Sequence, residues 1–222
     1  MARRIAFLQH SATDVPGVLG LLATGYGLEV SAHRADHGRA GLPAGGTFDL
    51  LVVLGSVASV TDAAVPWIAP ERQLVSRAVA DGVSVLGVCF GGQLLAQVLG
   101  GTVARAEQPE IGWRLLDTVD PARVPAGPWL DWHEDAFTCP PGAEPLARTD
   151  VSLHAFAQGP HTGVQFHPEV TVDVVTSWIG IDREQAGLTT DEVDALLTGF
   201  DQGGRGPDDQ ARTLFAGWLA RA

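Results

Sequence analysis

The sequence has few cysteines, because Cys89 and Cys139 are the only two among its 222 residues. Two cysteines without a regular spacing do not make a disulfide framework or a cysteine-type zinc site. A reducing cytoplasm is therefore the compartment that we expect. The sequence also shows no ligand-spaced group of histidines, and we expect neither a metal nor an organic cofactor. Solvated or core positions are predicted for His10, His33, His37, His154 and His161.

Positive charge is also scarce. Fourteen lysines and arginines oppose 26 aspartates and glutamates, which gives a formal net charge of −12. Such a charge repels the phosphate backbone of nucleic acids and the anionic surface of membranes. We therefore expect neither nucleic acid nor membrane as a partner.

Long hydrophobic runs that suggest targeting or membrane insertion are missing as well. The opening MARRIAFLQH has only a short apolar run, too short for the core of a secretory signal, and it is predicted to form a first strand. Residues 82–104 carry no charge but include six glycines. We interpret them as a buried strand, a tight turn and a buried helix.

What the sequence does contain is an alternation of apolar strands and amphipathic helices in its first half. Strands are predicted at 4–9, 28–33, 48–55 and 83–88, and helices at 15–27 and 65–82. Strands that are apolar throughout are typical of a parallel sheet covered on both faces. This indicates an α/β fold of the flavodoxin-like kind, a doubly wound, mostly parallel sheet flanked by helices, with its ligand site beyond the carboxyl ends of the strands.

The second half has a different pattern. Short alternating segments from 112 to 169, broken by proline and glycine, predict antiparallel strands added to the same sheet. A helix is expected at 172–178, followed by two amphipathic helices at 189–200 and 207–222 with a flexible link at 201–206. We expect a single domain over 1–222, with a helical C-terminal tail from about residue 184.

The segment Gly87-Val88-Cys89-Phe90-Gly91 has the pattern of a nucleophile elbow. Small residues two before and two after the central residue permit a strained turn from strand to helix that exposes one side chain above the sheet. Cys89 would then lie at a helix N-terminus, which favours a thiolate, and the N–H of Phe90 would point towards an oxyanion. The alternative is that Cys89 is simply a small core residue.

The segment VQFHPEV supplies a base for this cysteine. Pro168 biases His167 towards an extended backbone, in which side chains two apart project the same way. His167 and Glu169 can then lie side by side, so that Cys89, His167 and Glu169 form a nucleophile, a base and its orienting group. The alternative is a surface turn in which the histidine and the glutamate are adjacent by chance.

GVCFGGQLLA (87–96) and FHPE (166–169) resemble the signatures of class I, triad-type glutamine amidotransferases, and the tail resembles that of stand-alone, GMP-synthetase-like members. The resemblance implies Cys89 as nucleophile, His167 as general base and acid, and Glu169 as its orienting group. It also implies an oxyanion hole formed by Phe90, Gly55 and Ser56. The substrate contacts that it implies are Gln93, Trp132, His133 and Asp135.

One position departs from the family pattern. Where the family has Gly-Gly-Pro after the third strand, this chain has Gly55-Ser56-Val57. If the turn requires a positive φ at Ser56, the cost is on the order of 1 kcal/mol, which would weaken the oxyanion hole.

Three functions follow from these residues. The first is a glutamine amidotransferase that hydrolyses L-glutamine through a cysteinyl thioester and passes ammonia to a partner, an ATP-dependent synthetase subunit, because the chain has no P-loop motif of its own. The second is a stand-alone hydrolase of γ-glutamyl amides or peptides that uses the same triad. The third is a non-catalytic regulatory module on the same fold, supported only by the Gly-Ser-Val departure.

Overall fold

The computed structural model describes residues 2–184, 186–201 and 207–222. Its main sheet has eight strands in the order β2-β1-β3-β4-β10-β9-β8-β6. Their bounds are β1 Arg4–Gln9, β2 Glu29–Arg34, β3 Leu50–Val53, β4 Ser84–Val88, β6 Asp117–Thr118, β8 Glu144–Arg148, β9 Leu153–Gln158 and β10 His161–Val164. The pairs from β2 to β10 are parallel and those from β10 to β6 are antiparallel, which confirms the predicted fold class.

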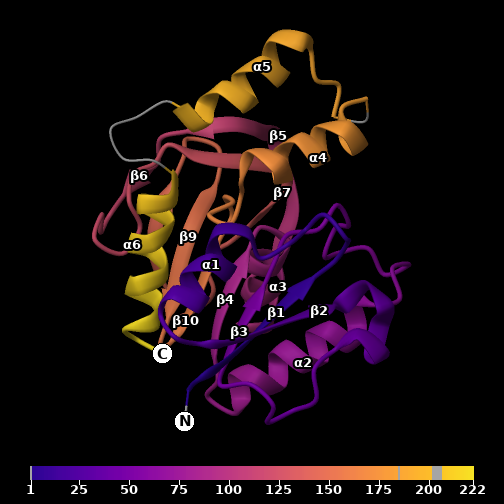
Figure 1. The fold of residues 1–222 in the computed structure, drawn as a ribbon, viewed down its shortest axis with the longest axis vertical. Coiled ribbons are helices and arrows are strands. Elements are labelled where there is room, and N and C mark those ends of the chain that lie inside the picture. Colours follow the sequence, from indigo (N-terminus) through magenta and orange to yellow (C-terminus); the bar gives the residue numbers. More distant parts are fainter. Residues whose placement is uncertain (1, 185, 202–206) are drawn as a thin grey trace.

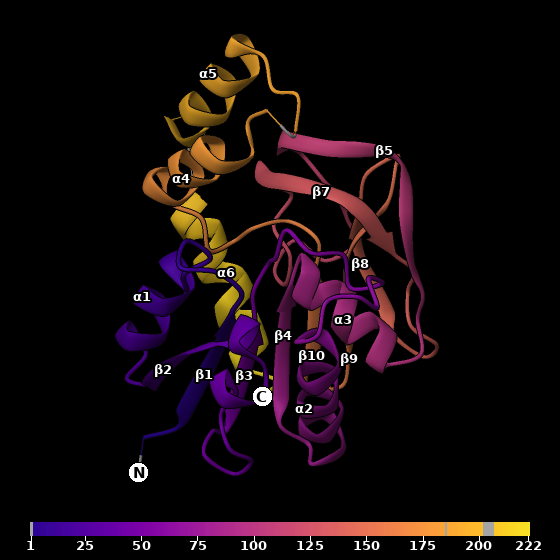
Figure 2. The same ribbon diagram turned by 90° about the vertical axis from the view of Figure 1, so that its right-hand side faces the viewer.

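One detail of the prediction is wrong, because not all the antiparallel strands join this sheet. β5 (Val103–Arg114) and β7 (Trp129–Phe137) pair with each other in a separate two-stranded sheet. The physical reason is that β6 and β8 occupy the antiparallel edge of the main sheet, so the longer β5 and β7 satisfy their backbone hydrogen bonds mutually. Figure 2 shows this small sheet at one end of the molecule, with both chain termini at the other.

Helices cover both faces of the main sheet (Figure 1). One layer contains α1 (Gly17–Gly25) and α6 (Pro207–Leu219), and the other contains α2 (Ile68–Ala80) and α3 (Phe90–Val98). Two short 3-10 helices, η1 (Ala35–Gly41) and η2 (Gly199–Asp201), lie in connections.

The apolar central strands reflect this two-sided burial. Phe7 and Val52 face the core under α1 and α6, whereas Leu8 and Val53, one residue further on, face the core under α2 and α3. Since successive side chains of a strand point to opposite faces, a strand covered on both sides must be apolar at every position.

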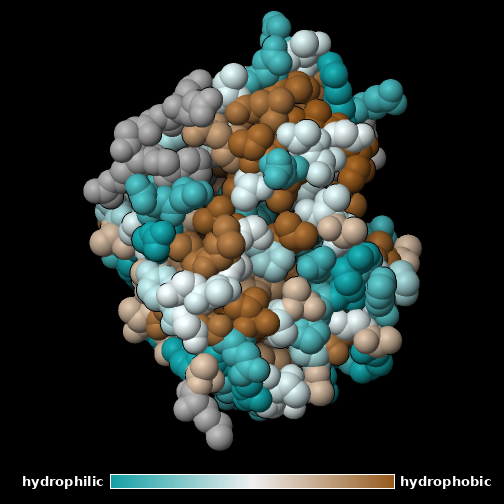
Figure 3. All heavy atoms as spheres, in the orientation of Figure 1, coloured by the Kyte–Doolittle hydropathy of each residue, from teal (hydrophilic) through white to brown (hydrophobic). Residues whose placement is uncertain are grey.

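The remaining helices, α4 (Val172–Asp182) and α5 (Thr190–Thr198), pack against the small sheet around a third apolar cluster. α4 runs beyond the predicted 172–178, and α5 starts with a capping box between Thr189 and Glu192. Figure 3 shows apolar side chains gathered over this part of the surface. Most of the link predicted at 201–206 lies outside the described residues.

The uncharged segment 82–104 folds as predicted, into β4, a sharp turn and α3. Within the described residues, no helix combines the length and the apolar composition needed to cross a membrane.

Candidate active site

Cys89 lies at a strained turn between β4 and α3. Its φ is 50° and its ψ is −109°, and within the described ranges no other non-glycine residue has a positive φ. A β-carbon on Gly87 would collide with the carbonyl oxygen of Gly91, and one on Gly91 would collide with that of Val53. The two glycines therefore permit the turn that presents the cysteine side chain.

The hydrogen-bond partners of Cys89 come from the end of β10 and from β7. Its N–H donates to the carbonyl oxygen of Val164 in β10 at 2.8 Å. Its Sγ lies 3.9 Å from the carbonyl oxygen of Trp132 and 3.6 Å from Nε2 of Gln165. Phe90 is the first residue of α3, so its N–H has no partner within the helix.

The structure brings His167 and Glu169 together, as the sequence predicts. Nδ1–H of His167 donates to Oε1 of Glu169 at 2.7 Å, and both side chains are buried. The imidazole packs edge-on against Trp178 with ring centroids 4.9 Å apart. A β-carbon on Gly55 would lie 2.9 Å from Cε1 of His167 and 3.7 Å from Cβ of Cys89, so a side chain at this position would crowd the imidazole.

The charge on His167 is stabilised by its neighbours. Burial alone would lower its pKa, but the Glu169 carboxylate and Cys89 raise it well above the ordinary value of 6.5. Nε2 of His167 has no hydrogen-bond partner among the residues that the structure describes. This nitrogen is the one free to exchange a proton.

A buried ion pair that the sequence did not reveal holds the loop after β3. Both ring nitrogens of His10 face acceptors, the carbonyl oxygen of Gly55 at 2.7 Å and the carboxylate of Glu71 at 3.0 Å. Burial would lower the pKa of His10, but Glu71 and the Gly55 carbonyl raise it. Ser56 does not have a positive φ, so the strain considered for the Gly-Ser-Val departure does not arise.

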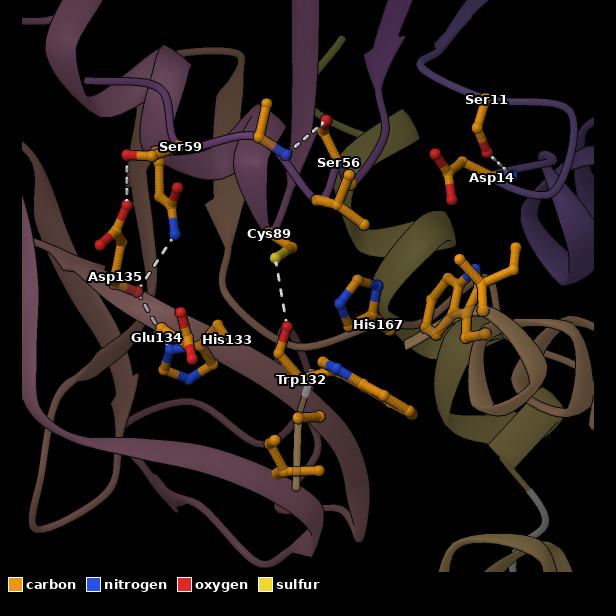
Figure 4. Close-up of a pocket in the computed structure, with 18 of the residues that line it drawn as sticks. Ser11, Asp14, Ser56, Ser59, Cys89, Trp132, His133, Glu134, Asp135 and His167 are labelled. Carbon is orange, nitrogen blue, oxygen red and sulfur yellow. Dashed lines mark hydrogen bonds between the residues drawn. The ribbon is translucent and has the colours of Figure 1, made fainter. Parts of the chain in front are cut away.

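A cavity of about 360 Å³ opens in front of Cys89 and His167 (Figure 4). It is lined by all four residues expected to bind substrate, Gln93, Trp132, His133 and Asp135, and by Gly55 and Ser56. Gln93 Nε2 donates to the carbonyl oxygen of Asp135 at 3.1 Å, and the Ser59 hydroxyl donates to the Asp135 carboxylate.

His133 differs from the other three because its ring is turned into the protein. Nδ1–H donates to the carbonyl oxygen of Asp135 at 3.0 Å, while Nε2 faces Oε2 of Glu110 at 3.6 Å. Glu110 also accepts from His154, which the sequence did not group with any other candidate ligand. A possible signal was the β5–β7 register, in which Glu110 and His133 are directly opposite.

The chain is similar to several known proteins. The chain is 36% identical to GMP synthase (glutamine-hydrolyzing) of Thermomicrobium roseum over 127 residues and 41% identical to that of Thermus thermophilus over 128 residues. Each match covers 54% of this chain but 23% and 24%, respectively, of the relative. The matched part therefore spans about a quarter of the length of these relatives.

Solved structures extend the likeness over almost the whole chain. A glutamine amidotransferase from Methylobacillus flagellatus superposes with a TM-score of 0.83 at 26% identity, covering 99% of this chain and 95% of the other. One from Thermotoga maritima has a TM-score of 0.88 at 22% identity, with 99% of both chains covered, and shows the common fold. The family description "Glutamine amidotransferase class-I" matches residues 21–176. The chain belongs to the class I glutamine amidotransferase family.

Proposed function

We propose that this protein hydrolyses the side-chain amide of L-glutamine and supplies the ammonia to a synthetase. The observation that carries the proposal is the convergence on one cavity of Cys89, at a strained elbow, and the buried His167–Glu169 pair. A nucleophile, a base with a free Nε2 and a carboxylate that orients the base are the parts required for acyl transfer through a thioester.

In the first step, Cys89 gives its proton to Nε2 of His167, and the resulting thiolate attacks the amide carbon of glutamine. The carbonyl oxygen becomes an oxyanion that the N–H groups of Phe90 and the Gly55-Ser56 loop stabilise. The His10–Glu71 pair holds the Gly55 carbonyl, which keeps that loop in place before substrate arrives.

In the second step, His167 returns a proton to the nitrogen, the C–N bond breaks and ammonia leaves a γ-glutamyl thioester on Cys89. Water then attacks the thioester with His167 as base, the C–S bond breaks, and glutamate and the free thiol are formed. Glu169 stabilises the imidazolium of His167 during both thioester formation and thioester hydrolysis. Gln93, Trp132 and Asp135 form the substrate-binding wall of the cavity, and His133 borders it with its ring turned into the protein.

The proposed partner is an ATP-dependent synthetase. This rests on the relatives, which are named as glutamine-hydrolyzing GMP synthases and are about four times as long as the part matched here. We propose the cytoplasm as the site of the reaction, where a catalytic thiol stays reduced.

A γ-glutamyl amide or peptide hydrolase is the second candidate. The acyl half of the reaction is the same, and only the leaving amine differs. The observation that favours it is the open mouth of the cavity, where Val57 is 81% exposed and Ile181 is 66% exposed. A bulky leaving group could extend past these two side chains.

Glutamate release from L-glutamine and from a γ-glutamyl alkylamide would test both candidates, using the wild type, Cys89→Ala and Cys139→Ala. Cys139 is the matched control, because it is the other free cysteine and its Sγ contacts only the carbonyl oxygen of Ala143 among the described hydrogen-bond partners. We expect activity on glutamine that Cys89→Ala abolishes and Cys139→Ala retains.

Preference for the alkylamide would favour the hydrolase instead. If neither substrate is hydrolysed, labelling by an electrophilic glutamine analogue is measured next. Labelling that depends on Cys89 supports a glutamine site that needs its synthetase for turnover. Absence of labelling contradicts the proposed function.

A further inference from the structure

We propose that Glu110, His133 and His154 form a zinc site between the small sheet and the main sheet. The three residues come from β5, β7 and β9, and one donor atom of each lies within 4.8 Å of the others. Two imidazole nitrogens with one carboxylate oxygen form a donor set that zinc uses in proteins.

The spacing of the donor atoms suits a tetrahedral ion. Oε2 of Glu110 lies 3.1 Å from Nε2 of His154 and 3.6 Å from Nε2 of His133. Ligand bonds of 2.0–2.1 Å in a tetrahedron place the donor atoms about 3.3 Å apart. Small side-chain movements would therefore suffice to admit the ion, and a water molecule would complete the coordination.

The hydrogen-bond pattern of His133 leaves its buried Nε2 available as a ligand. Nδ1 must carry the proton, because it faces the Asp135 carbonyl oxygen, which only accepts. In the neutral ring Nε2 then presents a lone pair to the Glu110 carboxylate, so that two acceptors face each other. This nitrogen has no hydrogen-bond partner among the described residues, and its side chain is only 1% exposed. Burying two facing acceptors is unfavourable unless a positive charge lies between them.

Both histidines also have the outer contacts typical of zinc ligands. Nδ1 of His154 faces Oδ1 of Asp131 at 3.3 Å, and Nδ1 of His133 faces a backbone carbonyl. Such contacts orient the ring and select the nitrogen that binds the metal.

The charges around the site leave room for a cation. Glu110 and Asp131 carry two negative charges, and Arg114 near both of them supplies one positive charge. Nε2 of His154 and Oε2 of Glu110 lie 3.1 Å apart, and the ion would insert between these two atoms and Nε2 of His133.

The position of the site indicates a structural role. It ties β5 and β7 to β9 and holds His133, whose Nδ1–H contacts the same Asp135 carbonyl oxygen that Gln93 contacts. Cys89, His167 and Glu169 are not members of the cluster, so the inference stands whether or not glutamine is the substrate.

Equilibrium binding of Zn²⁺ and Co²⁺ to chelator-treated protein tests the proposal, with all variants made in a Cys89→Ser background that removes the thiol as a competing ligand. We expect one ion per chain by elemental analysis, the visible absorption of four- or five-coordinate Co²⁺, and a thermal midpoint that rises with Zn²⁺.

The key variant is His133→Gln, because it removes the proposed ligand atom Nε2, which has no hydrogen-bond partner among the described residues. We expect at least 100-fold weaker binding for His133→Gln and 10- to 100-fold weaker binding for Asp131→Asn. His161→Gln is the matched control, a buried histidine of β10 outside the cluster, and should bind as the parent does.

Circular dichroism verifies that each variant is folded. No bound ion at millimolar Zn²⁺, or equal affinity in the parent and in folded His133→Gln, would overturn the proposal. The cluster would then be a hydrogen-bonded network only.

Discussion

The carboxylate of Glu169 governs the protonation of His167. Its Oε1 accepts from Nδ1–H at 2.7 Å, and its negative charge is a main reason why the pKa of His167 is raised despite burial. A raised pKa means that the imidazolium persists to higher pH. The proposed acid that delivers a proton to the leaving nitrogen is therefore available above neutral pH.

Glu169→Gln removes the charge and keeps the size of the side chain. Since the pKa of His167 then falls, the alkaline limb of the kcat/KM profile for glutamine should move to lower pH. We expect kcat/KM at neutral pH to drop about 100-fold or more. Glu144→Gln, at an exposed carboxylate of β8 that pairs with Arg123, is the control and should leave the profile unchanged. An unshifted profile in Glu169→Gln would contradict this role.

At the scale of elements, the turn from β4 to α3 depends on close backbone contact. Gly91 packs directly against the carbonyl oxygen of Val53 at the end of β3, with no space for a side chain. This contact sets the distance between the helix that starts after Cys89 and the strand that leads to Gly55. The sulfur of Cys89 and the proposed oxyanion loop at Gly55 and Ser56 are thereby positioned together.

Gly91→Ala should push α3 away from β3 and destabilise the protein by about 1–3 kcal/mol. Denaturant unfolding measures this, and the rate of Cys89 labelling should fall with it. Gly180→Ala in α4 is the matched control, because beyond its chain neighbours and the backbone of its own helix no heavy atom lies within 4 Å of the added carbon, and the φ of Gly180 is not positive. That change should be neutral or stabilise by up to about 1 kcal/mol. Equal effects of the two substitutions would refute the steric explanation.

For the whole molecule, the C-terminal helix α6 is part of the main core. Leu214, Phe215 and Trp218 are fully buried beside residues of α1 and of the central strands. The tail therefore completes one of the two helical layers, and its contribution to stability should be that of a core element.

Leu214→Ala should lower the free energy of unfolding by about 2–5 kcal/mol, because it leaves a cavity in that layer. Leu21→Ala in α1 makes the same chemical change at a position that is 73% exposed, and should alter stability by less than about 0.5 kcal/mol. Chemical denaturation of both variants distinguishes them. Similar losses would mean that α6 packs less closely than its burial indicates.

Much of this protein could be predicted from local features of its sequence. Apolar segments that alternate with amphipathic ones predict β1 to β4 and the helices between them. The central strands are apolar because they are buried on both faces of the sheet. Small residues around Cys89 specify the elbow, and Pro168 favours the extended backbone that brings His167 beside Glu169. In each case the cause acts over a few residues, so the pattern is visible in the chain.

Only the tertiary structure decided the contacts between distant segments. His10 meets Glu71 across 61 positions, and His154 meets Glu110 across 44. Strand pairing also decided that β5 and β7 form their own sheet, since any antiparallel partner satisfies the same backbone groups. These contacts depend on how the layers of the fold pack together and on which buried charged groups then need a partner. The periodicity of a short segment contains no information about either of these.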